Sequence, residues 1–269
     1  MSDELRRLKQ AAGELLATDR MLIGEFLPAG RPLAAARPSA PAPPAPAPAA
    51  PAAGETGSRF DVPPAPATDL SHPKNRELRE MDVQQVRTCR KCRLCEGRRN
   101  TAFGEGNPDA AVFFIGEGPG EEEDIQGRPF VGRAGELLTK MIAAMGLRRS
   151  GVYIGNVVKC RPPGNRAPLP DEAAACGGYL WQQLRIIRPR VIVTLGNPAT
   201  HAVLQTTEGI TTIRGAWRKL PLSLADLGDV PVMPTFHPAY VLRSYTPDNR
   251  KKVWHDLQQV MKRIAAGES

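Results

Sequence analysis

The stretch AVFFIGEGPG, residues 111–120, joins a run of apolar residues to a glycine-rich turn. A short apolar run bounded by glycine is typical of a strand that is buried on both faces. Glycines directly after such a strand let the backbone approach a ligand closely. The spacing differs from that of the dinucleotide-binding fingerprint, and no phosphate-binding Lys-Ser/Thr pair follows. The turn is therefore either a ligand site of another kind or an ordinary strand-to-helix connection.

Apolar runs of the same kind recur along the chain and predict four buried strands: Ala111–Ile115, Val152–Val158, Arg190–Leu195 and Val230–Phe236. Helical patterns lie between and after them, at Ala134–Met145, Asp171–Ile187 and Asp248–Ile264. Asn197 and Pro198 are typical of the N-cap and first residue of a further helix. Strands that alternate with helices predict an α/β fold, a three-layer α/β/α sandwich with a short central parallel sheet of about four strands. Ligands of such sheets bind at the carboxyl ends of the strands.

The composition changes twice along the chain and predicts three regions. Apolar residues at three- and four-residue steps predict an amphipathic helix in residues 1–27, which is a candidate docking helix for a protein partner. Residues 28–71 are rich in Pro and Ala and hold few large apolar side chains, so we expect a disordered linker. Residues 72–269 contain the predicted strands and should form the folded domain.

The net charge is +8, with a sequence pI near 9.5. Residues 1–70 hold seven Lys/Arg and eight Asp/Glu, so the remainder of the chain carries the whole positive excess. A basic folded region favours polyanions such as nucleic acid. The longest apolar runs are too short to span a bilayer, and no signal-type segment starts the chain. We expect a cytoplasmic monomer with no membrane association.

The chain holds five cysteines, at positions 89, 92, 95, 160 and 176. An odd number of thiols in a reducing compartment favours a metal site or a free thiol over disulfides. Four thiolates from two distant segments suit either structural zinc or a [4Fe–4S] cluster. Cys160 and Cys176 are too far apart in sequence for a short zinc knuckle, which favours the cluster.

Polar residues follow the first and the last predicted strand. His237 ends the last strand and is followed by Pro238, which suits an electrophile or a proton donor. The acids Glu121, Glu122, Glu123 and Asp124 follow the first strand. Their crowding favours a solvated helix face over a metal site.

Several motifs, in this order, resemble those of the family 4 uracil-DNA glycosylases. They are Gly104-Glu-Gly-Asn-Pro108, Gly116-Glu-Gly-Pro-Gly120, Gly127-Arg-Pro-Phe-Val-Gly132, Asn156-Val-Val-Lys-Cys-Arg-Pro-Pro163, Asn165-Arg-Ala-Pro168 and His237-Pro-Ala-Tyr240. The resemblance covers the chain from about residue 88 to the last helix. It implies an enzyme that flips uracil out of DNA and hydrolyses its N-glycosidic bond in base-excision repair, with uracil-containing DNA as its partner.

The resemblance also implies a structural [4Fe–4S] cluster. Its ligands would be Cys89, Cys92, Cys160 and Cys176, and Cys95 would be an extra thiol. A register in which Cys92 and Cys95 form the ligand pair is the alternative.

The resemblance assigns the base pocket to Phe130, Asn156 and His237. Phe130 would stack on the extruded base, Asn156 would read the edge of uracil, and His237 would face uracil O2. Gly118, also expected at the substrate, stands where other uracil glycosylases carry a water-activating aspartate. Glu117 is therefore the first candidate to position the water, and Asn165 is the second.

After His237, the segment Tyr240–Arg243 resembles a loop that enters the minor groove. Lys159, Arg161 and Arg166 are candidate phosphate contacts. The rival interpretation is a catalytically inactive or polymerase-associated DNA-binding module that carries the cluster. Intact Glu117, Asn156 and His237 argue against it.

Overall fold

The structure is a computed structural model, and it describes residues 60–65 and 68–267. The chain divides into the units Met1–Ser58 and Arg59–Ser269, and the described residues all belong to the second unit. The predicted helix of residues 1–27 and most of the predicted linker therefore lie outside the described residues.

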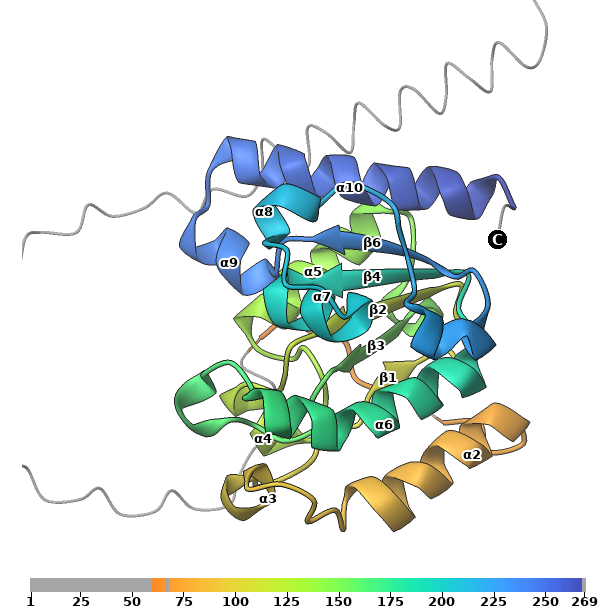
Figure 1. The fold of residues 1–269 in the computed structure, drawn as a ribbon, viewed down its shortest axis with the longest axis vertical. Coiled ribbons are helices and arrows are strands. Elements are labelled where there is room, and N and C mark those ends of the chain that lie inside the picture. The colour runs from red at the N-terminus through yellow and green to blue at the C-terminus, as the bar shows by residue number, and fades with distance from the viewer. Residues whose placement is uncertain (1–59, 66–67, 268–269) are drawn as a thin grey trace, which may run out of the picture. The chain divides into compact units, whose positions relative to one another are not determined.

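A single six-stranded sheet with the order β1-β3-β2-β4-β6-β5 forms the centre of the described fold (Figure 1). Its four inner strands are parallel and match the four predicted strands: β3 (Tyr153–Asn156), β2 (Val112–Gly116), β4 (Val191–Leu195) and β6 (Pro231–Thr235). The edge strands β1 (Glu105–Gly106) and β5 (Arg218–Lys219) pair antiparallel. The predicted parallel sheet of four strands is confirmed. The two edge strands were missed because each has only two residues and no apolar run.

Helices lie on both faces of this sheet, which confirms the three-layer α/β arrangement (Figure 1). The larger ones are α2 (Pro73–Met81), α5 (Arg133–Ala144), α6 (Pro170–Ile187), α7 (Gly196–Leu204) and α10 (Pro247–Ala265). The short ones are α3 (Leu94–Gly97), α4 (Glu121–Gln126), α8 (Ile210–Ile213), α9 (Pro238–Arg243), the π-helix η1 (Asp82–Val86) and the 3-10 helices η2 (Arg149–Gly151), η3 (Pro163–Asn165) and η4 (Leu222–Leu227).

Alternation along the strands sends side chains to both layers. Phe113 and Ile115 of β2 share one apolar cluster with Leu180 and Leu184 of α6 and Val203 of α7. On the opposite face, the Thr235 hydroxyl at the end of β6 donates to the carboxylate of Asp256 in α10 at 2.6 Å. All four parallel strands are fully buried, which explains why their sequences are mostly apolar and do not alternate.

The start of α7 differs from the prediction. The helix begins at Gly196, so Asn197 lies inside its first turn and is not the N-cap. The Asn197 side-chain oxygen instead accepts the Ile210 N–H at 2.6 Å. This bond fixes the loop that leads to α8.

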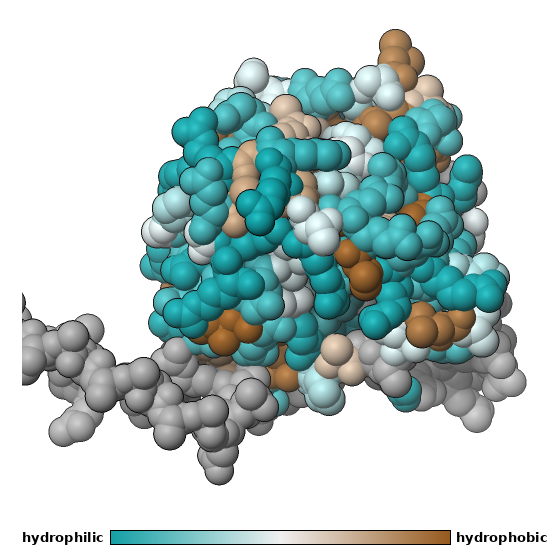
Figure 2. Space-filling model, turned by 90° about the horizontal axis from the view of Figure 1, so that it is seen from below, coloured by the Kyte–Doolittle hydropathy of each residue, from teal (hydrophilic) through white to brown (hydrophobic). Residues whose placement is uncertain are grey.

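The surface around α2 and α3 is largely hydrophilic, with isolated hydrophobic residues (Figure 2). Among the described helices, none combines the length and apolarity that crossing a bilayer requires.

Two helical glycines give a matched test of packing. An added Cβ at Gly178 in α6 meets nothing within 4 Å, whereas one at Gly135 in α5 would lie 1.8 Å from the backbone oxygen of Phe130. We expect Gly178→Ala to stabilise the protein by about 0.5–1 kcal/mol through helix propensity. We expect Gly135→Ala to destabilise it by roughly 1–3 kcal/mol through overpacking. Urea unfolding midpoints measure both, and shifts of the same sign would contradict this account.

Candidate active site

A cleft of about 730 Å³ opens at the carboxyl ends of the parallel strands. Its lining includes Glu117 after β2, Asn156 at the end of β3, Gly196 after β4 and His237 after β6. Phe130, from the loop between α4 and α5, lines it as well. The cleft thus lies where a parallel sheet is expected to bind its ligand.

Asn156 contributes an unpaired polar atom to this cleft. The residue is 1% exposed, and its Oδ1 is buried without a hydrogen-bond partner among the described residues. An added Cβ at Gly116 would lie 2.4 Å from this oxygen, so glycine at the end of β2 makes room for the amide. A buried, unpaired amide oxygen is costly, and a ligand N–H would remove that cost.

Phe130 is held in an unusual backbone conformation. Its φ is 52°, in the left-handed region that phenylalanine rarely adopts. The residue is 5% exposed, and its ring lies 5.7 Å from the His237 ring, centroid to centroid, with an angle of 31° between the two planes. The aromatic ring therefore forms a wall of the cleft beside the histidine.

His237 is the N-cap of α9, and its Nδ1 accepts the N–H of Ala239 at 3.1 Å. A ring nitrogen that accepts a backbone N–H carries no proton, so the neutral ring has its proton on Nε2. Burial lowers the pKa of His237 to about 4, and the positive charge of Arg243 acts in the same direction. Near neutral pH this residue is an uncharged hydrogen-bond donor.

The two candidates for holding a water differ in environment. Burial raises the pKa of the Glu117 carboxyl, and the nearby charge of Arg243 opposes this shift. Asn165 is exposed, and its Oδ1 accepts the Arg161 Nε–H at 2.7 Å. Gly118 packs closely, because an added Cβ would lie 2.7 Å from a methyl group of Val158. A side chain at position 118 would therefore require this wall of the cleft to move.

The acids after β2 do not form one solvated face, so that prediction was wrong. Glu123 is 9% exposed and Asp124 is 2% exposed. The Glu123 carboxylate accepts three backbone N–H groups, and Asp124 Oδ1 accepts those of Arg99 and Asn100 at 2.9 and 3.3 Å. Each carboxylate offsets its burial by accepting backbone amides from a neighbouring loop.

The prediction that Lys159 contacts phosphate was also wrong. Lys159 is 1% exposed, and its ammonium donates to the Asn156 backbone oxygen at 2.9 Å and to Gln183 Oε1 at 2.6 Å. Burial lowers its pKa to about 8. Arg166 lines the cleft but donates twice to the buried Glu172 carboxylate, at 2.7 and 2.8 Å.

The segment Tyr240–Arg243 is helical and lies within α9, so it is not a loop. Tyr240 is 36% exposed, and its ring lies 4.9 Å from that of Phe236. Arg243 lines the cleft. Ile210 and Thr211 of α8 line it too, and nothing in their sequence marked them, because their place depends on how the loop folds back.

All five cysteines line one small cavity, formed by the Cys89–Cys95 segment, the turn after β3 and α6. Cys160 and Cys176 are buried, and the other three are half-buried. Arg98 donates to Cys160 Sγ at 3.2 Å, and the Lys159 backbone N–H donates to Cys176 Sγ at 3.3 Å.

This set of donors fits a group that binds several thiolates. Burial raises the pKa of Cys176 to about 11, so a bound cation would be needed to hold it as thiolate. N–H donors to sulfur are also found around iron–sulfur clusters. Within residues 60–65 and 68–267, no group of three or more His, Cys, Asp or Glu side chains is arranged for a single metal ion.

A doubly covered parallel sheet with a partly buried polar cleft at its strand ends defines a ligand-binding α/β protein. Within this class of proteins, the chain belongs to the uracil DNA glycosylase superfamily. The sequence profile of that superfamily matches residues 103–258.

The similar curated proteins include several Type-4 enzymes. The chain is 50% identical to the Type-4 uracil-DNA glycosylase of Thermotoga maritima over 163 residues, which is 60% of this chain and 82% of that protein. It is 45% identical to the Type-4 enzyme of Sulfurisphaera tokodaii over 61% of this chain and 74% of that protein. The resemblance to family 4 is thereby confirmed.

Proposed function

We propose that this protein is a uracil-DNA glycosylase that binds uracil-containing DNA, flips uracil into the cleft and hydrolyses its N-glycosidic bond. The observation that carries the proposal is the unpaired Oδ1 of the buried Asn156, in a cleft that Phe130 and His237 also line. An amide that shares a cleft with an aromatic wall and a neutral histidine suits a planar base with carbonyl and N–H groups on its edge.

His237 would stabilise the leaving group. Cleavage of the N-glycosidic bond leaves an oxocarbenium-like sugar and a uracil anion. The Nε2–H of a neutral histidine can donate to uracil O2 as negative charge develops there. A charged imidazolium is not required, which agrees with the lowered pKa of this residue.

Asn156 would select uracil over cytosine. Its amide carries a donor and an acceptor, which match the O4 and N3–H of uracil. Cytosine would place an amino group and an unprotonated nitrogen there, so two buried polar groups would be mispaired. Phe130 would stack on the base, and its left-handed backbone would set the position of the ring.

A [4Fe–4S] cluster bound by Cys89, Cys92, Cys160 and Cys176 would serve as a scaffold, since hydrolysis requires no electron transfer. It would hold the segment around Cys89 and Cys92 against the turn after β3 and α6. Cys95 lines the same cavity, so the alternative register remains open to test.

The proposed catalytic domain comprises residues 72–269, and its first helix, α2, begins at Pro73. The end of the proposed linker also contacts the domain. Val62 is 8% exposed, and the Pro63 backbone oxygen accepts a hydrogen bond from Arg128 at 2.8 Å. The docking role of residues 1–27 for a protein partner remains part of the proposal.

The rival function, an inactive or polymerase-associated module, gains no support from the site. Phe130, Asn156 and His237 all line the cleft, together with both candidates for holding the water.

Excision from a labelled oligonucleotide with one uracil, followed by alkaline cleavage, tests the proposal. We expect His237→Ala and Asn156→Ala each to lower the single-turnover rate by about 10²–10³-fold through lost transition-state hydrogen bonds. His201→Ala, a histidine whose ring contacts the Glu208 backbone oxygen, is the matched control and should retain the wild-type rate. If the wild-type protein binds this DNA but no strand cleavage follows, the proposed glycosylase activity is refuted.

The pH profile tests the role of Glu117. Since burial raises the pKa of this carboxyl above 4.5, the carboxylate should be lost at a higher pH than usual. The rate should be full above this pKa and fall about tenfold per pH unit below it. Glu117→Gln should remove this acid limb and slow the reaction by about 10²–10⁴-fold. A smaller loss than that of Asn165→Ala would assign the water to Asn165 instead.

Iron content tests the cysteine site. We expect purified protein to be brown and to hold about four irons per chain. Cys176→Ala should lose most of this iron, whereas Cys95→Ala should retain it. If Cys95→Ala loses the iron and Cys89→Ala retains it, the ligand pair is Cys92 and Cys95, as in the alternative register. A colourless zinc-loaded protein would exclude the cluster.

A further inference from the structure

The conformation of Phe130 requires an explanation that the cleft itself does not provide. Phenylalanine at a φ of 52° is strained, and such a residue persists only where its surroundings hold it. The ring also has little free space, because an added Cβ at Gly116 would lie 2.4 Å from its Cζ. A small shift of this backbone would therefore move the aromatic wall of the cleft.

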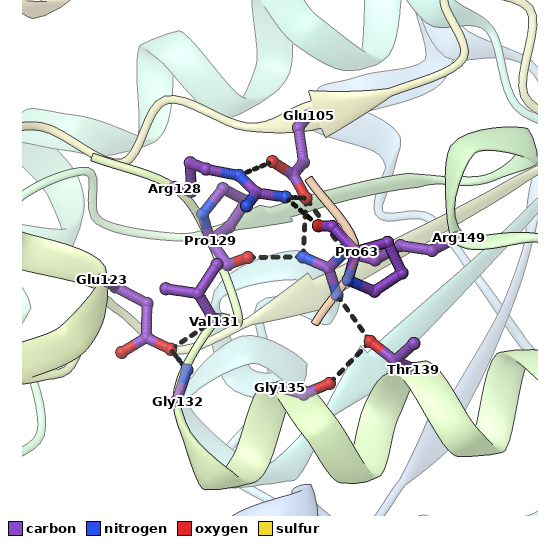
Figure 3. Close-up of polar contacts among 10 residues, drawn as sticks. All are labelled: Pro63, Glu105, Glu123, Arg128, Pro129, Val131, Gly132, Gly135, Thr139 and Arg149. Carbon is purple, nitrogen blue, oxygen red and sulfur yellow. Dashed lines mark hydrogen bonds and ion pairs between the residues drawn. The ribbon is translucent and has the colours of Figure 1, made fainter. Parts of the chain in front are cut away.

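The peptide before Phe130 is held by Arg149, which lies in η2 outside the cleft (Figure 3). Its guanidinium donates to the Pro129 backbone oxygen at 2.6 Å. The same side chain is 6% exposed and donates twice to Glu105 Oε1, at 2.7 and 2.9 Å. Glu105 in turn accepts the Arg128 Nε–H at 2.8 Å. The bonds to Glu105 fix the orientation of the Arg149 guanidinium, and one of its N–H groups holds the Pro129 carbonyl in place.

The peptides after Phe130 are held by Glu123 of α4 (Figure 3). Its Oε1 accepts the N–H groups of Val131 at 2.8 Å and Gly132 at 2.9 Å. Its other oxygen accepts the N–H of Gly120 at 3.1 Å. One carboxylate thus joins the turn that carries Phe130 to the turn that carries Glu117 and Gly118.

We propose that Glu123 and Arg149 are positioning residues that hold the peptides on both sides of Phe130 and so set the affinity of the cleft for uracil. The inference rests on the proposed function, because it takes uracil to be the base that stacks on Phe130. Without these bonds the backbone can relax towards the right-handed or extended regions that phenylalanine prefers. The ring then tilts away from the base plane, while the phosphate contacts of DNA are unaffected.

Equilibrium dialysis with labelled uracil separates base binding from turnover. We expect Glu123→Ala to weaken uracil binding by about tenfold, the order of one lost aromatic stacking contact. Its affinity for DNA with a tetrahydrofuran abasic site, which offers no base, should stay within about twofold of the wild type. Glu123→Gln should retain most of the uracil binding, because its amide oxygen can still accept the N–H groups of Val131 and Gly132.

Asp124→Ala is the matched control. Asp124 is the next residue in the same helix, is also buried, and accepts two backbone N–H groups of a different loop. It should lower stability without changing uracil affinity. Equal losses of uracil affinity in Asp124→Ala and Glu123→Ala would reduce Glu123 to a structural role and overturn the proposal, as would unchanged affinity in Glu123→Ala.

Arg149→Lys provides a second variant if Glu123→Ala does not fold. Lysine keeps the charge beside Glu105 but lacks the fork that also reaches the Pro129 oxygen. It should weaken uracil binding in the same direction, and unchanged binding would overturn the proposal. Dialysis requires no turnover, so a wild type that binds uracil but excises none would refute the proposed function and leave this test intact.

Discussion

The constraint on which the structure depends is the parallel pairing of β3, β2, β4 and β6. Parallel strands end at one edge of the sheet, so residues far apart in the sequence become neighbours there. Glu117 and His237 follow β2 and β6, and Asn156 ends β3, so all three line one cleft. The apolar layers on both faces keep the strands in register. The packing of the core therefore determines where the polar side chains at this edge lie.

The sequence predicted this arrangement well because fully buried strands appear as uninterrupted apolar runs. It could not predict where charged residues become buried. The sequence around Lys159 suggests a surface lysine, yet its ammonium is buried and donates hydrogen bonds to Gln183 and to the Asn156 carbonyl. Glu123 and Asp124 read as two of four crowded acids, and only the folded loops supply the amides that they accept. Each depends on a partner from another segment, which no local pattern specifies.

The cysteine cavity and the base cleft are close neighbours in the structure. Lys159 contacts both, since its backbone N–H donates to Cys176 Sγ and its ammonium donates to the Asn156 backbone oxygen. Asn156 ends β3, and Cys160 lies four residues later in the turn. A scaffold that orders this turn therefore also orders the backbone that presents the amide. This agrees with the structural role proposed for a cluster at these thiols.

The bond from Arg128 to the Pro63 carbonyl has a consequence for the N-terminal extension. Val62 is buried beside it, and Phe60 lines the cleft, so the chain enters the domain at the rim of the cleft. The rim of the cleft therefore includes a residue from before the predicted domain boundary, so a truncated chain that starts at residue 72 would lack part of this rim.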